Sequence, residues 1–307
     1  MTTKLAPFFI VGASRSGTTL LRLMVNEHPT LHVPRESWFI IDLMDALPLE
    51  SPLSEEQIRL AFDIVTAHWR WKEWGIAESR LWDRLAPLHE PLLSDLIDAV
   101  FRLSSERSGA HRWGDKTPEY IRHIDRLHKV FPEAKFIHII RDGRDVSLSL
   151  TRYEYRDGVF SENAKYWAEW VAAGIESGRT LPKSLYLEIA YEDVVLRTEQ
   201  ALKKVCQFLD VPYSPTMPKF YKHVEKNLAY WELGHHYKTL RPPSCEEVHK
   251  WRREMGMLDL VVFEAVAGRT MDKVNHSRSF SGISRIIPET YRALIKVAEW
   301  SLPLLQK

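Results

Sequence analysis

Residues Phe8–Glu36, FFIVGASRSGTTLLRLMVNEHPTLHVPRE, decide the fold that we predict for this chain. A short apolar run, Phe8 to Val11, stops at Gly12 and is followed by a loop of small residues. Apolar residues then return at helical spacing between Leu20 and Val25. The pattern predicts a strand, a loop and a helix.

The loop between this strand and this helix has the properties of an anion site. The first N–H groups of a helix have no intrahelical partner, and the helix dipole favours negative charge there. Gly12 and Gly17 let the backbone approach a ligand closely, and Arg15 supplies a planar cation. Hydroxyl donors come from Ser16, Thr18 and Thr19. We therefore expect the loop to bind a phosphate or sulfate ester.

The position of the cation separates this loop from that of the nucleoside-triphosphate enzymes. Their motif places a Lys directly after the second glycine, where the ammonium reaches the outer phosphates. Here Thr18 follows Gly17, and the cation is Arg15 inside the loop. The Arg-Ser-Gly-Thr-Thr segment after a strand resembles instead the 5′-phosphosulfate loop of the sulfotransferases that use 3′-phosphoadenosine 5′-phosphosulfate (PAPS).

Composition bounds the class of protein. The chain has 307 residues, 45% hydrophobic and 27% charged, which is typical of a globular protein with a full core. Its 42 basic and 41 acidic residues nearly cancel, so we expect no nucleic-acid partner. Cys206 and Cys245 show neither a metal-ligand spacing nor a disulfide framework. We expect a cytoplasmic protein without a bound metal.

No segment of the sequence predicts a stable membrane anchor. The apolar run at the N-terminus is too short for a signal sequence or a membrane span. The amphipathic stretch Tyr291–Leu305 could touch a membrane surface, but a docked C-terminal helix is the favoured interpretation.

A second strand and a helical insertion follow the first helix. Leu31–Val33 predicts a short strand, after which Glu36 would face the crevice at the carboxyl edge of a parallel sheet, unless it is simply solvated. Residues 37–112 predict a helical insertion, in which Ser54 begins a capping box. The insertion holds tryptophans that either belong to a core or line an apolar acceptor pocket, namely Trp69, Trp71, Trp74 and Trp82.

Three later segments carry candidate site residues. Lys116 precedes a helix start at Thr117. A nearly continuous apolar strand over 135–140 ends at Arg141, and Ser149 lies eight residues further on. Tyr191 follows a strand over 185–189. The alternatives are a surface lysine, a salt-bridged strand end beside a surface serine, and a core tyrosine.

Taken in order, these segments resemble a PAPS-dependent sulfotransferase over about residues 8–260. They are most similar to the branch that contains the tyrosylprotein enzymes. The resemblance implies that Arg141 and Ser149 hold the 3′-phosphate and that Tyr191 contacts the adenine or a phosphate. It also implies that Lys116 contacts the transferring group.

The same resemblance assigns the catalytic base. In that branch the base is a Glu twenty-one residues after the loop arginine, and this spacing leads from Arg15 to Glu36. His28, His32 and His111 are the competing candidates.

The chain also departs from that branch. Its enzymes carry a membrane anchor and luminal disulfides, for which this sequence has no pattern. An arginine that they place twelve residues after the 3′-phosphate arginine is Tyr153 here. We therefore expect a hydroxyl-bearing small molecule, glycolipid or carbohydrate as acceptor rather than a protein tyrosine.

The expected fold is a single α/β domain over residues 1–307, a P-loop-like parallel sheet flanked by helices, with the insertion at 37–112 on the acceptor side. The expected reaction transfers a sulfuryl group from PAPS to an acceptor hydroxyl and leaves PAP, the 3′,5′-bisphosphate. Glu36 would take the proton, while Arg15 and Lys116 would stabilise the leaving phosphate without a metal. A P-loop kinase or NTPase, or an inactive PAPS-binding scaffold, remains the alternative.

Overall fold

The computed structural model describes residues 5–106, 108–152, 160–224, 228, 234 and 237–280. Within it the chain forms two compact units. The first comprises Met1–Arg141 and Ala173–Val248, and the second comprises Asp142–Ala172 and His249–Lys307. A single domain over 1–307 stays a prediction. Tyr153 and the stretch Tyr291–Leu305 lie outside the described residues.

A five-stranded parallel sheet is the centre of the first unit. Its spatial order is β2 (Leu31–His32), β3 (Arg112–Lys116), β1 (Phe8–Val11), β4 (Lys135–Ile140) and β5 (Tyr186–Ala190). Every residue of β1 and β3 is buried, as a parallel sheet covered on both faces requires. The predicted fold class, a parallel sheet flanked by helices with a helical insertion, is confirmed.

The strand order places the loop after β1 at the point where the chain changes direction across the sheet. Strands β3 and β2 lie on one side of β1, and β4 and β5 lie on the other. In register, Ile10 of β1 pairs with Lys116 and Val11 pairs with His138 of β4. Ligands of open α/β sheets collect at such a switch point, beyond the carboxyl ends of the strands.

Helices of the first unit cover the sheet, and an apolar core lies between them. They are α1 (Thr18–Asn26), α7 (Ile124–Val130), α10 (Tyr191–Leu196), α11 (Thr198–Phe208) and the short 3₁₀ helices η1 (Pro118–Arg122), η2 (Met217–Lys222), η3 (Tyr237–Leu240) and η4 (Cys245–Glu247). In this core Leu21 of α1, Ile139 of β4 and Leu202 of α11 are fully buried in one cluster.

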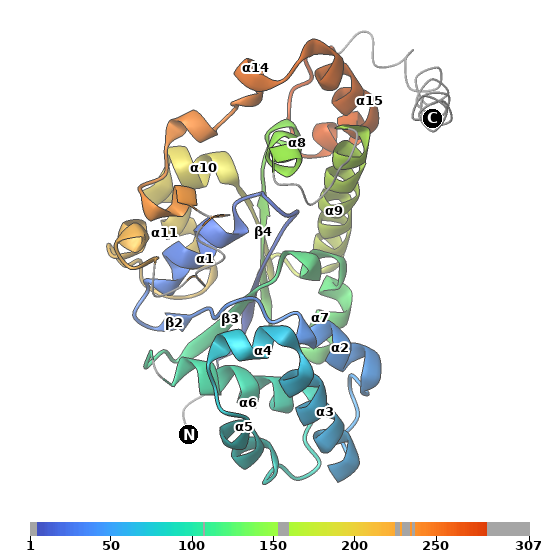
Figure 1. Ribbon diagram of the computed structural model, residues 1–307, viewed down its shortest axis with the longest axis vertical. Helices are drawn as coiled ribbons and strands as arrows, with labels where there is room; N and C mark the ends of the chain where they lie inside the picture. The colour runs from blue at the N-terminus through green and yellow to red at the C-terminus, as the bar shows by residue number, and fades with distance from the viewer. Residues whose placement is uncertain are drawn as a thin grey trace, which may run out of the picture. The chain divides into compact units, whose positions relative to one another are not determined.

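The helical insertion leaves the sheet after β2 and returns at β3. It consists of α2 (Phe39–Ala46), α3 (Glu55–Ala67), α4 (Trp69–Trp74), α5 (Glu78–Leu85) and α6 (Leu93–Ser105), drawn in blue to teal in Figure 1. The predicted capping box is present, because Gln57 N donates to Ser54 Oγ at 3.3 Å and Ser54 N donates to the Gln57 side chain at 2.9 Å. The ring of Phe101 in α6 stacks on that of Trp113 in β3, with centroids 4.2 Å apart, which anchors the insertion to the sheet.

The second unit is helical. It contains α8 (Gly143–Arg152), α14 (Trp251–Glu254), α15 (Met257–Lys273) and the first part of α9 (Phe160–Thr180), whose last residues belong to the first unit. The buried Arg144 pairs with Asp142 and Glu264, and its guanidinium lies 3.6 Å from the ring centre of Trp251. None of the described helices is both long enough and apolar enough to cross a bilayer.

Gly114 is the tightest requirement for a small residue in the centre of the sheet. A Cβ added there would lie 2.4 Å from two carbons of the Phe8 ring, which is buried in the neighbouring strand. Gly114→Ala should therefore lower the free energy of unfolding by about 1–3 kcal/mol, as overpacking typically does. Urea unfolding measures this. Gly256→Ala is the control, because its Cβ would meet only Asp259 Oδ2 at 3.5 Å. Equal losses in both variants would contradict the packing argument.

Candidate active site

The loop after β1 is confined on both sides. A Cβ on Gly12 would lie 2.6 Å from the carbonyl oxygen of Ile139, and one on Gly17 would lie 2.4 Å from the ring of Tyr191. Gly17 also has φ +95°, and Arg15 has φ +70°, in the left-handed region that L-residues rarely adopt. Both positions therefore require glycine, because a side chain at either one would clash with the neighbouring residues.

Buried hydroxyl groups surround the start of α1. Ser16 is fully buried, and its Oγ makes no hydrogen bond with any described residue. Thr18 and Thr19, in the first turn, are also buried, and that turn holds no acidic residue. A buried hydroxyl without a partner is costly, and here it lies where helix N–H groups favour an anion. The loop therefore has the donors of an anion site.

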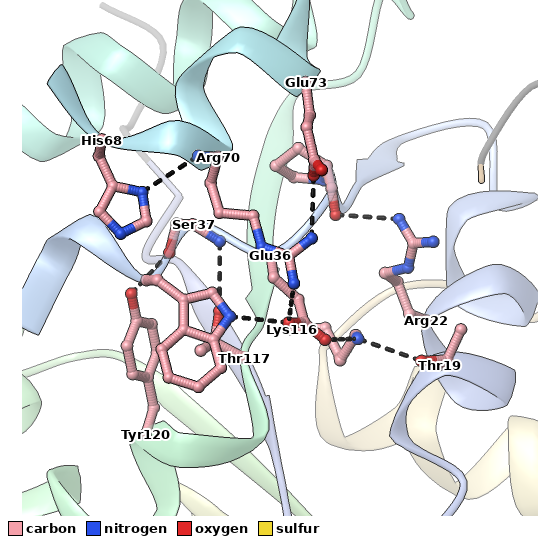
Figure 2. A network of polar contacts seen from close by, with 12 residues as sticks. Thr19, Arg22, Glu36, Ser37, His68, Arg70, Glu73, Lys116, Thr117 and Tyr120 are labelled. Carbon is pink, nitrogen blue, oxygen red and sulfur yellow. Dashed lines mark hydrogen bonds and ion pairs between the residues drawn. The ribbon is translucent and has the colours of Figure 1, made fainter. Parts of the chain in front are cut away.

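Lys116 joins this loop to Glu36 (Figure 2). Its Nζ donates to Thr19 Oγ1 at 3.1 Å and also contacts Oε1 of the Glu36 carboxylate. The lysine is only 2% exposed, so water screens neither contact strongly. One ammonium thus connects three segments that the sequence analysis singled out separately.

The second carboxylate oxygen of Glu36 is held by two other donors. Oε2 accepts a hydrogen bond from Trp38 Nε1 at 2.8 Å and one from the Arg70 guanidinium at 3.0 Å. Burial alone would raise the pKa of Glu36, but the charges of Lys116 and Arg70, with hydrogen bonds from Lys116 and Trp38, lower this pKa to about 2. The carboxylate is ionised at neutral pH.

Arg70 is a partner of Glu36 that sequence reasoning missed. It lies in α4 of the insertion, thirty-four residues after Glu36, and is buried. Its guanidinium also pairs with Glu73 at 2.9 Å. The sequence signal was one of two basic residues, Arg70 and Lys72, among the tryptophans of a predicted insertion, and no motif spacing pointed to it.

The backbone of Trp38 is strained beside this carboxylate. Trp38 has φ +57° and ψ −41° directly before α2, outside the regions that a bulky residue prefers. Strain of this kind clusters at functional sites, where the surrounding structure compensates for it. The unusual backbone accompanies the indole N–H bond to Glu36.

Arg141 and Tyr191 lie against the loop from the other side of β1. The Arg141 guanidinium donates to the carbonyl oxygens of Arg15 at 3.1 Å and Glu247 at 2.8 Å, and it lies 4.3 Å from the ring centre of Tyr191. Ser149 belongs to α8 in the second unit. Its pairing with Arg141 stays a prediction from the sequence.

Two of the three competing histidines have structural partners. His28 is bonded through Nε2 to the carbonyl oxygen of Pro212 at 2.8 Å, and its Nδ1 accepts from Thr30 N at 3.2 Å. His32 is bonded to Ser104 Oγ at 2.9 Å, and burial, with the nearby charge of Arg22, lowers its pKa to about 4. His111 is exposed.

The tryptophans of the insertion divide into two kinds. Trp71 is 2% exposed and belongs to the core of the insertion, whereas Trp74 is half-buried and packs its ring against Phe101 at 5.0 Å between centroids. Trp82 packs on Phe62. Trp69 is 55% exposed and lies under the Arg70 guanidinium. A tryptophan-lined acceptor pocket stays a prediction, and Trp69 is the most exposed of the four tryptophans.

Comparison with known proteins places this arrangement in a family. A family model described as the sulfotransferase family matches residues 7–215, more than half of the chain. The chain belongs to the sulfotransferase family. This match confirms the resemblance that the loop, the strand ends and their order indicate.

Individual relatives are distant. The chain is 23% identical to a protein-tyrosine sulfotransferase of Drosophila melanogaster over 252 residues, which cover 79% of this chain and 46% of that protein. It is 22% identical to protein-tyrosine sulfotransferase A of Caenorhabditis elegans over 259 residues, covering 80% of this chain and 61% of that protein. The chain therefore spans about half of the length of these relatives.

Two solved structures share the fold. The sulfotransferase domain from the curacin biosynthetic pathway has a TM-score of 0.63 at 19% identity, over 89% of this chain and 99% of that domain. The sulfotransferase domain of the Synechococcus PCC 7002 olefin synthase has a TM-score of 0.62 at 21% identity, over 90% and 98%. At such identities the likeness shows that this chain has the fold of those domains.

Asp115, next to Lys116 in β3, provides a test of the buried electrostatics. It is fully buried near the hydroxyls of Ser37 and Thr117, and burial raises its pKa to about 7, although these hydroxyls and Lys116 partly oppose the rise. In the unfolded chain the carboxyl titrates near 3.8. Between these values the folded protein keeps a proton that the unfolded chain has lost. Stability from this group should therefore fall as the pH rises from about 4 to 7, by up to about 1.4 kcal/mol per pH unit.

Asp115→Asn should remove this dependence. Relative to wild type, the free energy of unfolding of the variant should rise between pH 5 and pH 7 and then level off. Urea unfolding at pH 5, 6, 7 and 8 measures the difference, with Asp83→Asn, at an exposed position, as the control. A difference between Asp115→Asn and wild type that stays constant over this range would show that the carboxyl is ionised throughout.

Proposed function

We propose that this chain transfers a sulfuryl group from PAPS to a hydroxyl of an acceptor molecule, with PAP as the second product. The observation that carries the proposal is the buried Lys116 ammonium, which contacts both Thr19 at the start of the loop helix and the Glu36 carboxylate. An anion site and an ionised carboxylate lie within the reach of one cation. This is the arrangement that an in-line sulfuryl transfer needs.

The loop is the proposed site of the 5′-phosphosulfate. Donors to it would be the N–H groups at the start of α1, the buried Ser16 hydroxyl, the Thr18 and Thr19 hydroxyls, and the Arg15 side chain. Arg141 and Tyr191 lie next to the loop at the end of β4 and the start of α10, which supports a role for them on the nucleotide side. Ser149 joins them in the proposal on the eight-residue spacing alone.

The proposed step balances as follows. The acceptor O–H bond breaks, and its proton passes to Oε1 of Glu36. The acceptor oxygen forms a bond to sulfur, the bond from sulfur to the 5′-phosphate oxygen breaks, and its electron pair stays on PAP. Arg15, Lys116 and the N–H groups of α1 stabilise the charge that develops on the leaving phosphate.

The low pKa of Glu36 gives donor binding a role in catalysis. With both Lys116 and Arg70 directed at it, Glu36 is a weak base. A sulfonate at the loop would attract Lys116, which already contacts Thr19 there, and would weaken the pairing of Lys116 with Glu36. The pKa of the carboxyl would then rise, and Glu36 would become a stronger base once PAPS is bound. This favours an order in which the donor binds before the chemistry begins.

The acceptor side is assigned to the insertion. Arg70 contacts Glu36 and stacks over the exposed Trp69, so α4 brings an accessible aromatic surface close to the base. The acceptor classes that we propose are a hydroxyl-bearing small molecule, a glycolipid or a carbohydrate. The acceptor itself can be sought by mass spectrometry of cell extract incubated with the protein and isotopically labelled PAPS.

The proposed function makes a first prediction, which concerns nucleotide binding. PAP should raise the melting temperature without a divalent metal, because a ligand that binds only the native state stabilises it by mass action, about 2.7 kcal/mol at one hundred times Kd. Arg141→Ala should weaken the binding of PAP more than that of adenosine 5′-phosphate, which lacks the 3′-phosphate. Differential scanning fluorimetry with both nucleotides measures this, with Arg80→Ala, an exposed arginine of the insertion, as the control.

Two results would contradict that prediction. Stabilisation by ATP with magnesium but not by PAP would favour a kinase or NTPase. Equal losses for the two nucleotides in Arg141→Ala would show that Arg141 supports the loop through Arg15 and does not recognise the 3′-phosphate.

The second prediction is that Glu36→Gln lowers kcat by about 10²–10⁴-fold, the usual contribution of a positioned base, while PAP affinity stays near wild type. Because the change leaves Lys116 and Arg70 with one buried anion fewer, the variant should also be less stable. Its activity is therefore measured below its melting temperature and divided by the concentration of PAP-binding sites, which a titration with PAP determines. His32→Gln is the control. A Glu36→Gln protein that keeps more than about a third of kcat would exclude Glu36 as the base.

A further inference from the structure

Glu36 is one member of a buried row of four alternating charges. The row runs from Lys116 through Glu36 and Arg70 to Glu73, with Arg70 lying 3.0 Å from Glu36 and 2.9 Å from Glu73 (Figure 2). The side chains of Lys116 and Arg70 are 3% and 8% exposed, and those of Glu36 and Glu73 are 15% and 13% exposed. Two positive and two negative charges share one poorly hydrated site.

The Arg70 end of the row is fixed by its own helix and by the chain around Glu36. His68 caps α4 by accepting a hydrogen bond from Arg70 N at 3.2 Å, and the Arg70 guanidinium lies 4.1 Å from the ring centre of Trp69. Arg35, the residue before Glu36, donates to the carbonyl oxygen of Glu73 at 2.9 Å. The segment that carries Glu36 and the helix that carries Arg70 are therefore joined through both side chains and backbone.

The donors around Glu36 divide between its two oxygens. Oε2 accepts from Trp38 and Arg70, and both donors belong to the chain that begins the insertion or lies within it. Oε1 is the oxygen that contacts Lys116, on the side of the loop. Only Oε1 therefore contacts Lys116, the cation that bound PAPS would attract.

We propose that Arg70 is a positioning residue for Glu36, and that Glu73 is the counter-ion that keeps it in place. Together they hold Oε2 so that Oε1 receives the proton of the acceptor. The inference rests on the proposed function. It assigns the orientation of the base to two residues of the insertion, and no residue of the loop or of the strand ends is assigned this role.

Charge balance explains why Glu73 is needed. When Glu36 takes up the proton of the acceptor it becomes neutral, and Arg70 loses one of its two anions. A buried cation without an anion is costly, so a site without Glu73 would resist this step. With Glu73 at 2.9 Å, Arg70 keeps a partner before and after proton transfer. The proton later passes from Oε1 to solvent, which restores the starting charges.

The same row of charges predicts that substitutions of Arg70 and of Glu73 change the pKa of Glu36 in opposite directions. The charges that act directly on Glu36 are those of Lys116 in β3 and Arg70 in α4. Asp115 in β3 also interacts with Glu36, and Glu73 in α4 pairs with Arg70. Arg70→Gln removes one of the two cations that keep Glu36 ionised, so its pKa should rise. Glu73→Gln leaves the whole charge of Arg70 to Glu36, so its pKa should fall and the carboxylate should become a weaker base.

The experiment compares Arg70→Gln, Arg70→Lys and Glu73→Gln with wild type, using the acceptor identified with labelled PAPS. Arg70→Gln should lower kcat by about 10–100-fold, as misplacing a catalytic group does, with PAP affinity unchanged. The acid limb of its pH profile of kcat should move to higher pH, because the carboxyl keeps its proton to higher pH. Arg70→Lys, which keeps the charge, should restore the position of the limb but only part of kcat.

Glu73→Gln should also lower kcat, but its acid limb should stay at or below that of wild type. Arg80→Gln is the matched control, because Arg80 forms an exposed ion pair with Glu106 in the same insertion. It should behave as wild type. If Arg70→Gln fails to fold, Arg70→Lys and Glu73→Gln are compared with wild type by the same two measurements, kcat and the position of the acid limb.

Three outcomes are distinguishable. If Glu36→Gln abolishes turnover while the variants of Arg70 and Glu73 keep the kcat and acid limb of wild type, the positioning role is wrong and the proposed function stands. If the variants only lower the melting temperature and leave the limb unmoved, Arg70 and Glu73 are structural. Turnover that persists in Glu36→Gln would instead overturn the base assignment in the proposed function.

Discussion

The contact of the Lys116 ammonium with Thr19 on one side and Glu36 on the other is the interaction on which the rest of the site depends. It is possible because β3 pairs with β1 in a register that sets Lys116 opposite Ile10, at the edge where the loop begins. The packing of the Phe8 ring against Gly114 fixes that register from within the sheet. A position in the core thus determines where a cation of the site lies.

Burying such a cation imposes a condition on its neighbours, because a charge without a partner is costly in a poorly hydrated place. Glu36 meets the condition and is ionised as a result. Asp115, one residue before Lys116, is fully buried, and its pKa is raised to about 7. Two carboxyls that adjoin the same lysine are thus driven in opposite directions by their surroundings, which is how sites separate a base from a neutral group. The ionised one has two cations, and the other has mainly hydroxyls.

The sequence predicted features that depend on neighbouring residues, and it missed contacts that depend on packing between distant segments or on an unusual backbone. The loop from Gly12 to Thr19 is local, and its residue types indicated an anion site. The apolar strand over 135–140 indicated a parallel sheet, and the loop together with the later strand ends indicated the family. Lys116 and Glu36 were found because strand ends and a family spacing pointed to them. Arg70 and Trp38 were missed as partners of Glu36. Their contacts depend on how α4 packs and on an unusual backbone at Trp38, and neither leaves a periodic or spaced pattern. The tryptophans show the same limit, because the sequence did not separate the buried Trp71 from the exposed Trp69.

The place of the insertion allows its helices to change without disturbing the sheet. The chain leaves after β2 and returns at β3, and these strands are neighbours, with Leu31 paired to Arg112. The helices between them therefore begin and end at adjacent points of the sheet, so their length and sequence can change without altering the strand order. Glu36 lies at the start of the insertion and pairs with Arg70 within it, so the insertion also contacts the Glu36 carboxylate. Under the proposed function, a change in the insertion that alters the surface at Trp69 would therefore act on the protonation of Glu36 through Arg70, and this would link acceptor choice to base strength.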